Sequence, residues 1–161
     1  MEYKSTIKSR PYLYKETKKA SSLVNEGLDV DYIKEKSLQD NIFQLESEAR
    51  KKEVASIITA RLKDLDKQII YSIENSNVET SKVLVLYAIL KTDRLFFEFI
   101  NEVYKEKILL KDLFIKDKDF NLFFLKSGST ILGNISSNLW YISFTTLTTY
   151  HLLINYSKYC I

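Results

Sequence analysis

Histidine, cysteine, proline and glycine are scarce in this sequence, and their scarcity excludes several kinds of site and fold. The chain holds one histidine, one cysteine, one proline and three glycines. A single cysteine permits no intramolecular disulfide and no multi-cysteine metal site, and a lone histidine cannot form a paired-histidine zinc helix. So few glycines and prolines also leave little material for tight hairpin turns, which argues against a strand-rich sandwich or barrel. Helices joined by short polar turns are therefore expected.

Catalytic signatures are also missing. The sequence has no glycine-rich phosphate loop and no nucleophile elbow. His151 has no metal-ligand partners nearby in the sequence, and Cys160 sits where a thiolate is hard to orient, so both are interpreted as incidental to function. Two close carboxylate pairs could hold Mg²⁺ or Ca²⁺, but helix capping is the favoured interpretation: Asp29 with Asp31, and Asp117 with Asp119. We predict a non-enzymatic chain without metal, cofactor or small-molecule substrate.

The size and composition suit one globular domain. A chain of 161 residues with 45% hydrophobic and 28% charged residues can bury its own core. Its first residues lack the apolar stretch and small-residue cleavage site of a signal peptide. We therefore expect a cytoplasmic protein that forms a single compact multi-helix domain over residues 1–161.

The last part of the sequence is atypical. Residues 127–157 form a run of 31 residues without a formal charge, which raises the question of a membrane span. Asparagine, histidine and many hydroxyl side chains interrupt this run, so no window of about 20 residues is apolar enough, and no span is expected. The segment is interpreted as a packed element or an aggregation-prone β-rich tail.

Apolar spacing and capping signals predict a series of helices. Pro11 and Gly27 bracket the first, over residues 11–25, and Ser47 precedes the clearest, an amphipathic helix in which a bend near Asp66 is left open. The second and third are short, starting after Asp29 and at Ser37. A nearly uniform apolar segment favours a fully buried helix, although periodicity alone does not exclude a strand. Beyond the first, the expected helices cover residues 30–36, 37–45, 48–74, 81–91, 93–104 and 117–126.

The charge is unevenly distributed along the chain. Residues 1–20 hold six Lys/Arg against two acids, residues 21–49 hold two against seven, and residues 50–70 hold six against three. Two basic segments could fold into one basic face, or they could be solvated helix surfaces that pair with the acidic segment. In the first case the face would contact nucleic-acid phosphates without reading sequence. The candidate residues are Lys8, Arg10, Lys15, Lys18, Lys19, Arg50, Lys51, Lys52, Arg61, Lys63 and Lys67.

Several short stretches together resemble the BrxA family of BREX bacteriophage-defence systems, over residues 10–126. The matching stretches are residues 13–16, 23–27, 40–44, 61–65, 90–95, 97–99 and 119–126. They read LYKE, LVNEG, DNIFQ, RLKDL, LKTDRL, FEF and DFNLFFLK. Residues 127–161 depart from the family pattern, because relatives tend to have a charged final helical segment.

The resemblance implies a fold like that of the transcription antitermination factor NusB, no enzymatic activity, and binding to double-stranded DNA alongside other BREX proteins. It supplies no motif of DNA-contacting residues, so the basic positions named above remain our own hypothesis. Two alternatives stay open. One is a protein-interaction subunit of the defence complex, and the other is a NusB-like RNA-binding module.

Overall fold

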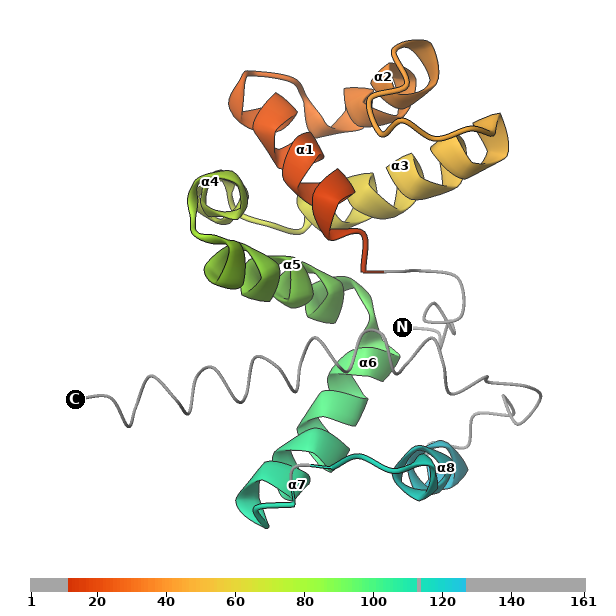
Figure 1. Ribbon diagram of the computed structural model, residues 1–161, viewed down its shortest axis with the longest axis vertical. Coiled ribbons are helices and arrows are strands. Elements are labelled where there is room, and N and C mark those ends of the chain that lie inside the picture. Colours follow the sequence, from red (N-terminus) through yellow and green to blue (C-terminus); the bar gives the residue numbers. More distant parts are fainter. Residues whose placement is uncertain (1–11, 113, 127–161) are drawn as a thin grey trace. The chain divides into compact units, whose positions relative to one another are not determined.

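Every element that the structure describes is a helix. The computed structural model describes residues 12–112 and 114–126, and it contains no strand in these ranges (Figure 1). This confirms the predicted all-helical class. Internal contacts divide the chain into two compact units, the first spanning Tyr12–Thr92 and the second beginning at Asp93. Each unit is described by itself, and the single-domain organisation stays a prediction.

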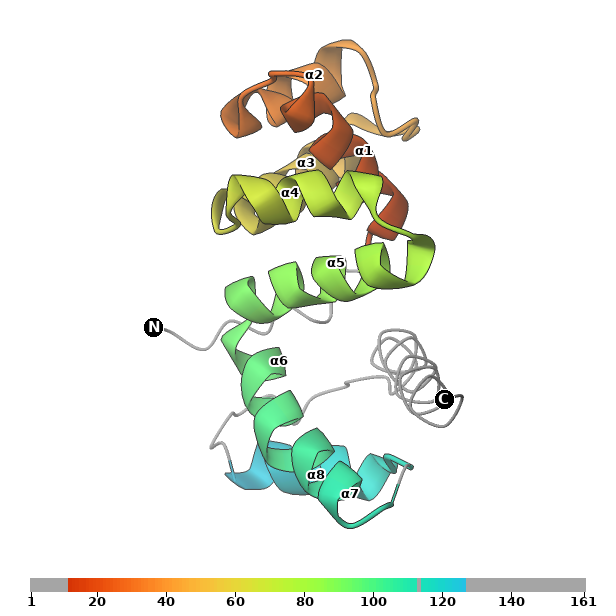
Figure 2. The ribbon, with the colours of Figure 1, turned by 90° about the vertical axis from the view of Figure 1, so that its left-hand side faces the viewer.

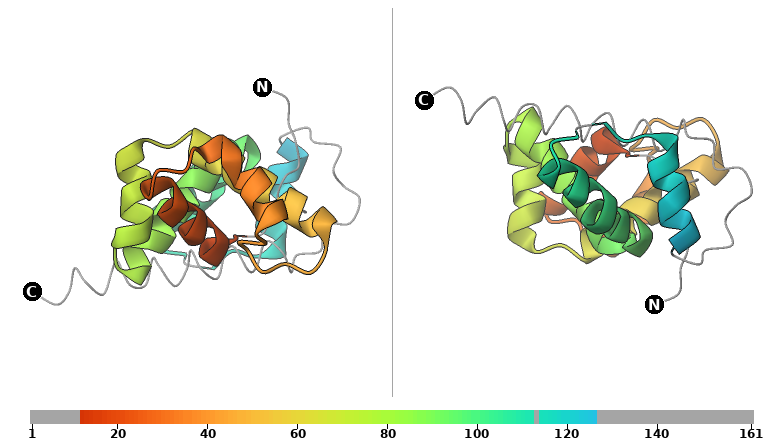
Figure 3. Two further views of the ribbon diagram at one scale, coloured as in Figure 1. Left: turned by 90° about the horizontal axis from the view of Figure 1, so that it is seen from above. Right: turned by 90° about the horizontal axis from the view of Figure 1, so that it is seen from below.

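The first unit is a bundle of helices around one apolar core. The helix α2 packs on α3, α1 packs on α4, and α5 packs on both α4 and α3. Seen from above in Figure 3 (left), α1 and α2 lie uppermost within this unit. The elements are α1 (Tyr14–Asn25), a 3₁₀ turn η1 (Val30–Tyr32), α2 (Ile33–Gln39), α3 (Glu48–Lys63), α4 (Lys67–Asn75) and α5 (Val78–Thr92). The core side chains include Ala20, Ile33, Val54, Ile58, Leu62, Ile73, Val85 and Ala88.

Capping chemistry sets several of these boundaries as predicted. Gly27 adopts a φ of 106°, and the N–H groups of Gly27 and Leu28 donate to the carbonyls of Val24 and Leu23, which is a Schellman ending of α1. The Ser47 hydroxyl accepts the Arg50 N–H at 3.3 Å and starts α3. The α1 helix begins three residues later than predicted, after Leu13 in the left-handed conformation.

The third predicted helix, over residues 37–45, is wrong. The chain instead leaves the helical region after α2, because Asn41 and Gln44 have φ values of 49° and 54°. The Asn41 side chain accepts the Leu45 N–H at 3.0 Å and stabilises this turn. Ser37 does not cap a helix there but lies buried within α2, where its hydroxyl donates to the Lys51 carbonyl.

The long helix predicted over residues 48–74 is divided in two. The chain turns at residues 64–66 between α3 and α4, and Asp66 takes an extended conformation with ψ of 148°. Leu65 is buried in the core between two exposed aspartates, so the turn satisfies an apolar residue that a continuous helix would direct elsewhere. The feature that appeared as a bend is therefore a complete break.

The segment predicted as a fully buried helix is only partly buried. In α5, Ser81, Val85 and Ala88 are buried, whereas Val83 and Tyr87 keep 39% and 41% of their surface exposed. The helical assignment is confirmed and the strand alternative is wrong. The Asn77 carboxamide accepts the Thr80 N–H at 2.8 Å, which places the start of α5 in the expected asparagine-rich turn.

The second unit contains a long interrupted helix and a shorter one. Figure 2 shows α6 (Arg94–Phe99), η2 (Ile100–Tyr104) and α7 (Lys105–Leu109) as one continuous helical rod, followed by α8 (Asp117–Lys126). The Asp93 carboxylate caps α6 by accepting the Phe96 N–H at 3.0 Å, as predicted. The middle segment η2 is a π-helix, a form found mostly as a single widened turn within an α-helix.

Within the described ranges, no helix combines the length and apolar character needed to cross a membrane.

Candidate functional site

The basic residues of α1 lie on its solvent face. Lys15 and Lys19 are exposed one helical turn apart, opposite the buried Thr17, Ala20 and Ser21. Neither lysine has an ion pair within the described part of the chain. These two cations are thus available to an external anion.

Lys18 lies to one side of this face, toward α4. The carboxylate of Glu74 accepts a hydrogen bond from the Asn25 amide at 2.5 Å. That bond is the main cause of the lowered pKa of Glu74, and Lys18 adds a weaker electrostatic contribution. Lys18 is therefore half-exposed and close to an acid, which leaves Lys15 and Lys19 as the least compensated cations of α1.

Most of the basic residues of α3 already have acidic partners. Arg50 pairs with Glu53 at 2.6 Å, and Lys52 lies 3.9 Å from Glu48. Lys63 pairs with Asp31 of η1, which belongs to the acidic segment of the sequence. Half-buried Lys51 and exposed Lys67 form no ion pair within the described ranges. Pairing with acids, the second possibility left open by the sequence, thus holds for part of this segment.

The prediction that Arg61 contributes to a basic surface is wrong. Arg61 is 2% exposed, and its Nη1 donates to the Tyr12 carbonyl at 3.0 Å. The same Tyr12 donates its hydroxyl to the Lys82 carbonyl at 2.6 Å. Arg61 therefore holds the segment before α1 against α3, and in this conformation it does not reach an external anion.

The structure does not bring the two basic segments together along α3. The start of α1 is tied to the end of α3 through Tyr12 and Arg61, whereas α2 contacts the beginning of α3 through Ser37 and Lys51. Ten residues of helix, about 15 Å, separate these two attachment points. Lys8 and Arg10 lie outside the described residues, as do His151 and Cys160.

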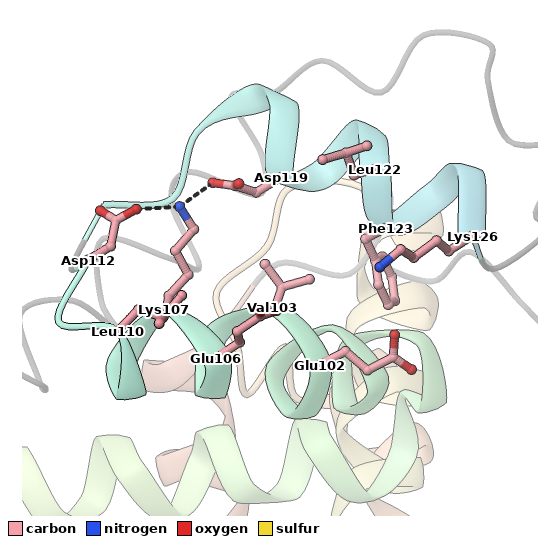
Figure 4. Close-up of a pocket in the computed structure, with 10 residues that line it drawn as sticks. All are labelled: Glu102, Val103, Glu106, Lys107, Leu110, Asp112, Asp119, Leu122, Phe123 and Lys126. Carbon is pink, nitrogen blue, oxygen red and sulfur yellow. Dashed lines mark hydrogen bonds and ion pairs between the residues drawn. The ribbon is translucent and has the colours of Figure 1, made fainter.

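A second candidate site is a pocket in the second unit. It has a volume of about 220 Å³ and lies between the η2–α7 segment and α8. Figure 4 shows Glu102, Val103 and Glu106 on one wall, facing Leu122 and Phe123 of α8. Leu110, Asp112, Lys107, Asp119 and Lys126 complete the lining. We name it the α7–α8 pocket.

An ion-pair network closes one end of the α7–α8 pocket. The Lys107 ammonium lies 2.7 Å from Asp112 and 2.9 Å from Asp119, and the Lys107 and Asp119 side chains are only 14% and 11% exposed. The hydrogen bond to Asp112 is the main cause of the raised pKa of Lys107. For Asp119, burial acts to raise the pKa, but hydrogen bonds from the Lys116 N–H and from Lys107 outweigh it, and the pKa is lowered. Both shifts favour the charged forms.

The network predicts a loss of stability at acid pH. Because the folded pKa of Asp119 lies below its usual 3.8, its contribution is complete above that value and is lost as the pH falls through the lowered pKa. Asp119→Asn should cost about 1–2 kcal/mol near neutral pH. Below about pH 3 the variant and the parent should converge. Urea denaturation at both pH values measures the difference, and a constant difference would contradict this role of Asp119.

Sequence reasoning missed the α7–α8 pocket, although one signal for it was visible. Asp117 and Asp119 were noted as a pair that could hold a cation, with capping favoured. The cation that Asp119 meets is Lys107, twelve residues earlier, across a turn that no local pattern specifies. Within the described residues, no cluster of three or more histidine, cysteine or acidic side chains could hold a metal ion. At the other acidic pair, Asp29 caps η1 by accepting the Asp31 N–H at 2.9 Å.

Comparison with known proteins places the chain. A profile of the BrxA family matches residues 1–130. The BREX protein BrxA of Bacillus cereus (strain H3081.97) is 56% identical over 122 residues, which cover 76% of this chain and 61% of that protein. The chain thus spans less than two thirds of the length of this curated relative. No solved structure matches. The predicted resemblance is confirmed, and the chain belongs to the BrxA family.

Proposed function

We propose that this chain is a non-enzymatic, cytoplasmic component of a BREX phage-defence system that binds double-stranded DNA through a basic helical surface. Family membership supports the BREX assignment. The single observation that carries the DNA proposal is the exposure of Lys15 and Lys19 on α1 without an ion pair in the described part of the chain. The proposed fold class remains NusB-like.

The electrostatics favour α1 as the centre of this surface. A DNA duplex carries one negative charge per about 1.7 Å of axis, so adjacent exposed lysines meet phosphates in many orientations. Lys51 and Lys67 can add contacts of the same kind. Arg50, Lys52 and Lys63 must exchange an acidic partner for a phosphate, and each exposed pair is worth only about 0–1 kcal/mol. These three are therefore secondary contributors.

Charge reversal on α1 tests the proposal. The double variant Lys15→Glu/Lys19→Glu should weaken duplex binding on the order of tenfold, because two phosphate contacts are lost and two repulsions are added. The slope of log affinity against log salt should become shallower by about 2. Fluorescence anisotropy with a labelled duplex at several salt concentrations measures both quantities.

The matched control is Lys105→Glu/Lys118→Glu, which changes the net charge equally at exposed lysines of the second unit. Equal weakening by the two double variants would show that total charge matters and that α1 does not. Competition between duplex DNA and RNA hairpins separates DNA binding from the RNA-binding alternative. Preference for the hairpins would reject the proposal as stated.

A second candidate function is contact with other BREX proteins. It is favoured by large apolar side chains of the second unit that are exposed to solvent. Clustered apolar surface of this kind often marks a protein-interaction site. The residues are Leu109, Leu110, Phe114, Leu122 and Leu125.

A further inference from the structure

The size of the α7–α8 pocket limits what it can hold. Its volume of about 220 Å³ is below the range of about 300–1,000 Å³ that is usual for cofactors and drug-sized ligands. That space accommodates one or two side chains of another molecule. An inserted side chain is therefore a better match than a free small molecule.

The pocket walls are apolar where such a side chain would enter. Val103 and Phe123 form the inner lining, and Phe123 is buried. Leu110 and Leu122 line the same pocket yet remain 71% and 55% exposed. Covering these two side chains would remove apolar surface from water, at about 25 cal/mol for each Å² buried. The occupant should thus bring apolar atoms of its own.

The charges around the pocket specify a cation beside those apolar atoms. Its lining contains four carboxylates and two lysines, and Lys107 is already held by Asp112 and Asp119. Glu102 and Glu106 are exposed, lie one turn apart on the same wall, and form no ion pair within the described ranges. Figure 4 shows both on the helix that faces Leu122. A nucleic-acid phosphate would be repelled here.

We propose that the α7–α8 pocket docks a basic, apolar peptide segment of another BREX protein. An aliphatic side chain of the partner enters between Val103 and Phe123 and covers Leu122. An arginine or lysine of the same segment pairs with Glu102 and Glu106. This inference rests on the proposed contact with other BREX proteins and is independent of DNA binding.

Titration with a defined peptide tests the inference. The full-length, isotopically labelled chain is titrated with a short amidated peptide in which leucine and arginine alternate, and amide shifts are followed by NMR. We expect shifts concentrated at Glu102, Val103, Glu106, Leu122 and Phe123. A peptide of equal length in which glutamate replaces arginine should produce none. Equal shifts with both peptides, or no binding up to millimolar concentrations, would overturn the inference.

Variants separate the pocket from general electrostatics. Glu102→Gln/Glu106→Gln should weaken peptide binding by about fivefold to tenfold, since two exposed ion pairs are lost. Leu122→Ser should also weaken it, and because Leu122 is exposed the fold should survive. The control Glu35→Gln/Glu46→Gln removes two exposed carboxylates of the first unit and should leave binding unchanged. An equal loss in that control would reject the pocket.

The DNA readout distinguishes this inference from the proposed function. The Glu102→Gln/Glu106→Gln variant should bind duplex DNA at least as tightly as the parent, because it removes negative charge. If peptide binding fails while DNA binding persists, only the docking proposal is rejected. If DNA binding fails while the peptide binds as expected, only the DNA proposal is rejected.

Discussion

Replacing Phe99 by alanine should destabilise the second unit by about 3–5 kcal/mol, which is a large part of the stability of a small domain. Phe99 is completely buried in α6. Its ring stacks on Phe120 with centroids 4.7 Å apart and meets Phe123 edge-on at 5.3 Å. Both partners belong to α8, so the substitution removes the main apolar connection between the two helices. Hydrogen exchange at the amides of α6 and α8 should accelerate strongly.

The neighbouring Phe97 offers a matched control. It lies on the same helix, and 49% of its surface is exposed. Phe97→Ala should cost less than about 1 kcal/mol, because little apolar area is returned to water. If the two substitutions had similar effects on exchange in α8, the Phe99–Phe120 stack would not be what holds α8 to α6.

Replacing Arg61 by alanine should destabilise the first unit by about 2–4 kcal/mol. The substitution removes a charged donor from the Tyr12 carbonyl and leaves a space where the packed side-chain stem was. Arg61→Lys should recover only part of the loss, since an ammonium does not reproduce the guanidinium geometry. Chemical denaturation followed by circular dichroism measures both variants.

Arg50→Ala is the matched control for this substitution. Arg50 lies on the same helix, but it is exposed and pairs only with Glu53. Its replacement should cost less than about 1 kcal/mol. The two arginines also differ in their expected effect on DNA. Under conditions where Arg61→Ala stays folded, the salt dependence of duplex binding should be unchanged. A shallower slope would restore Arg61 to the DNA-binding surface.

The sequence specified helix ends better than it specified surfaces. Gly27, Ser47, Asn77 and Asp93 each act through neighbours within four residues, and their capping roles follow from local chemistry. The turn at Asn41 and Gln44 was missed because left-handed residues other than glycine depend on the surrounding packing. Local rules therefore located most elements and failed where a turn depends on long-range contacts.

The candidate site shows the same limit more severely. Lys15 and Arg61 are both basic residues within a predicted helix, yet Lys15 is exposed and Arg61 is buried. The difference arises because the Tyr12 carbonyl, 49 residues earlier in the chain, accepts the Arg61 guanidinium. The partners of Lys63 and Lys107 are likewise distant or across a turn. Composition predicts how many cations exist, but the tertiary fold decides which remain available.

The π-helical segment η2 has a consequence for how sequences in this region can vary. A widened turn accommodates one extra residue in a helix, so residues on its two sides follow different angular registers. Each residue of an α-helix advances by about 100°, and removing one residue from Ile100–Tyr104 would rotate α7 by that amount relative to α6. Lys107 would then point away from Asp119. Length in this stretch is therefore as constrained as composition, and a single-codon deletion there should be more damaging than most substitutions.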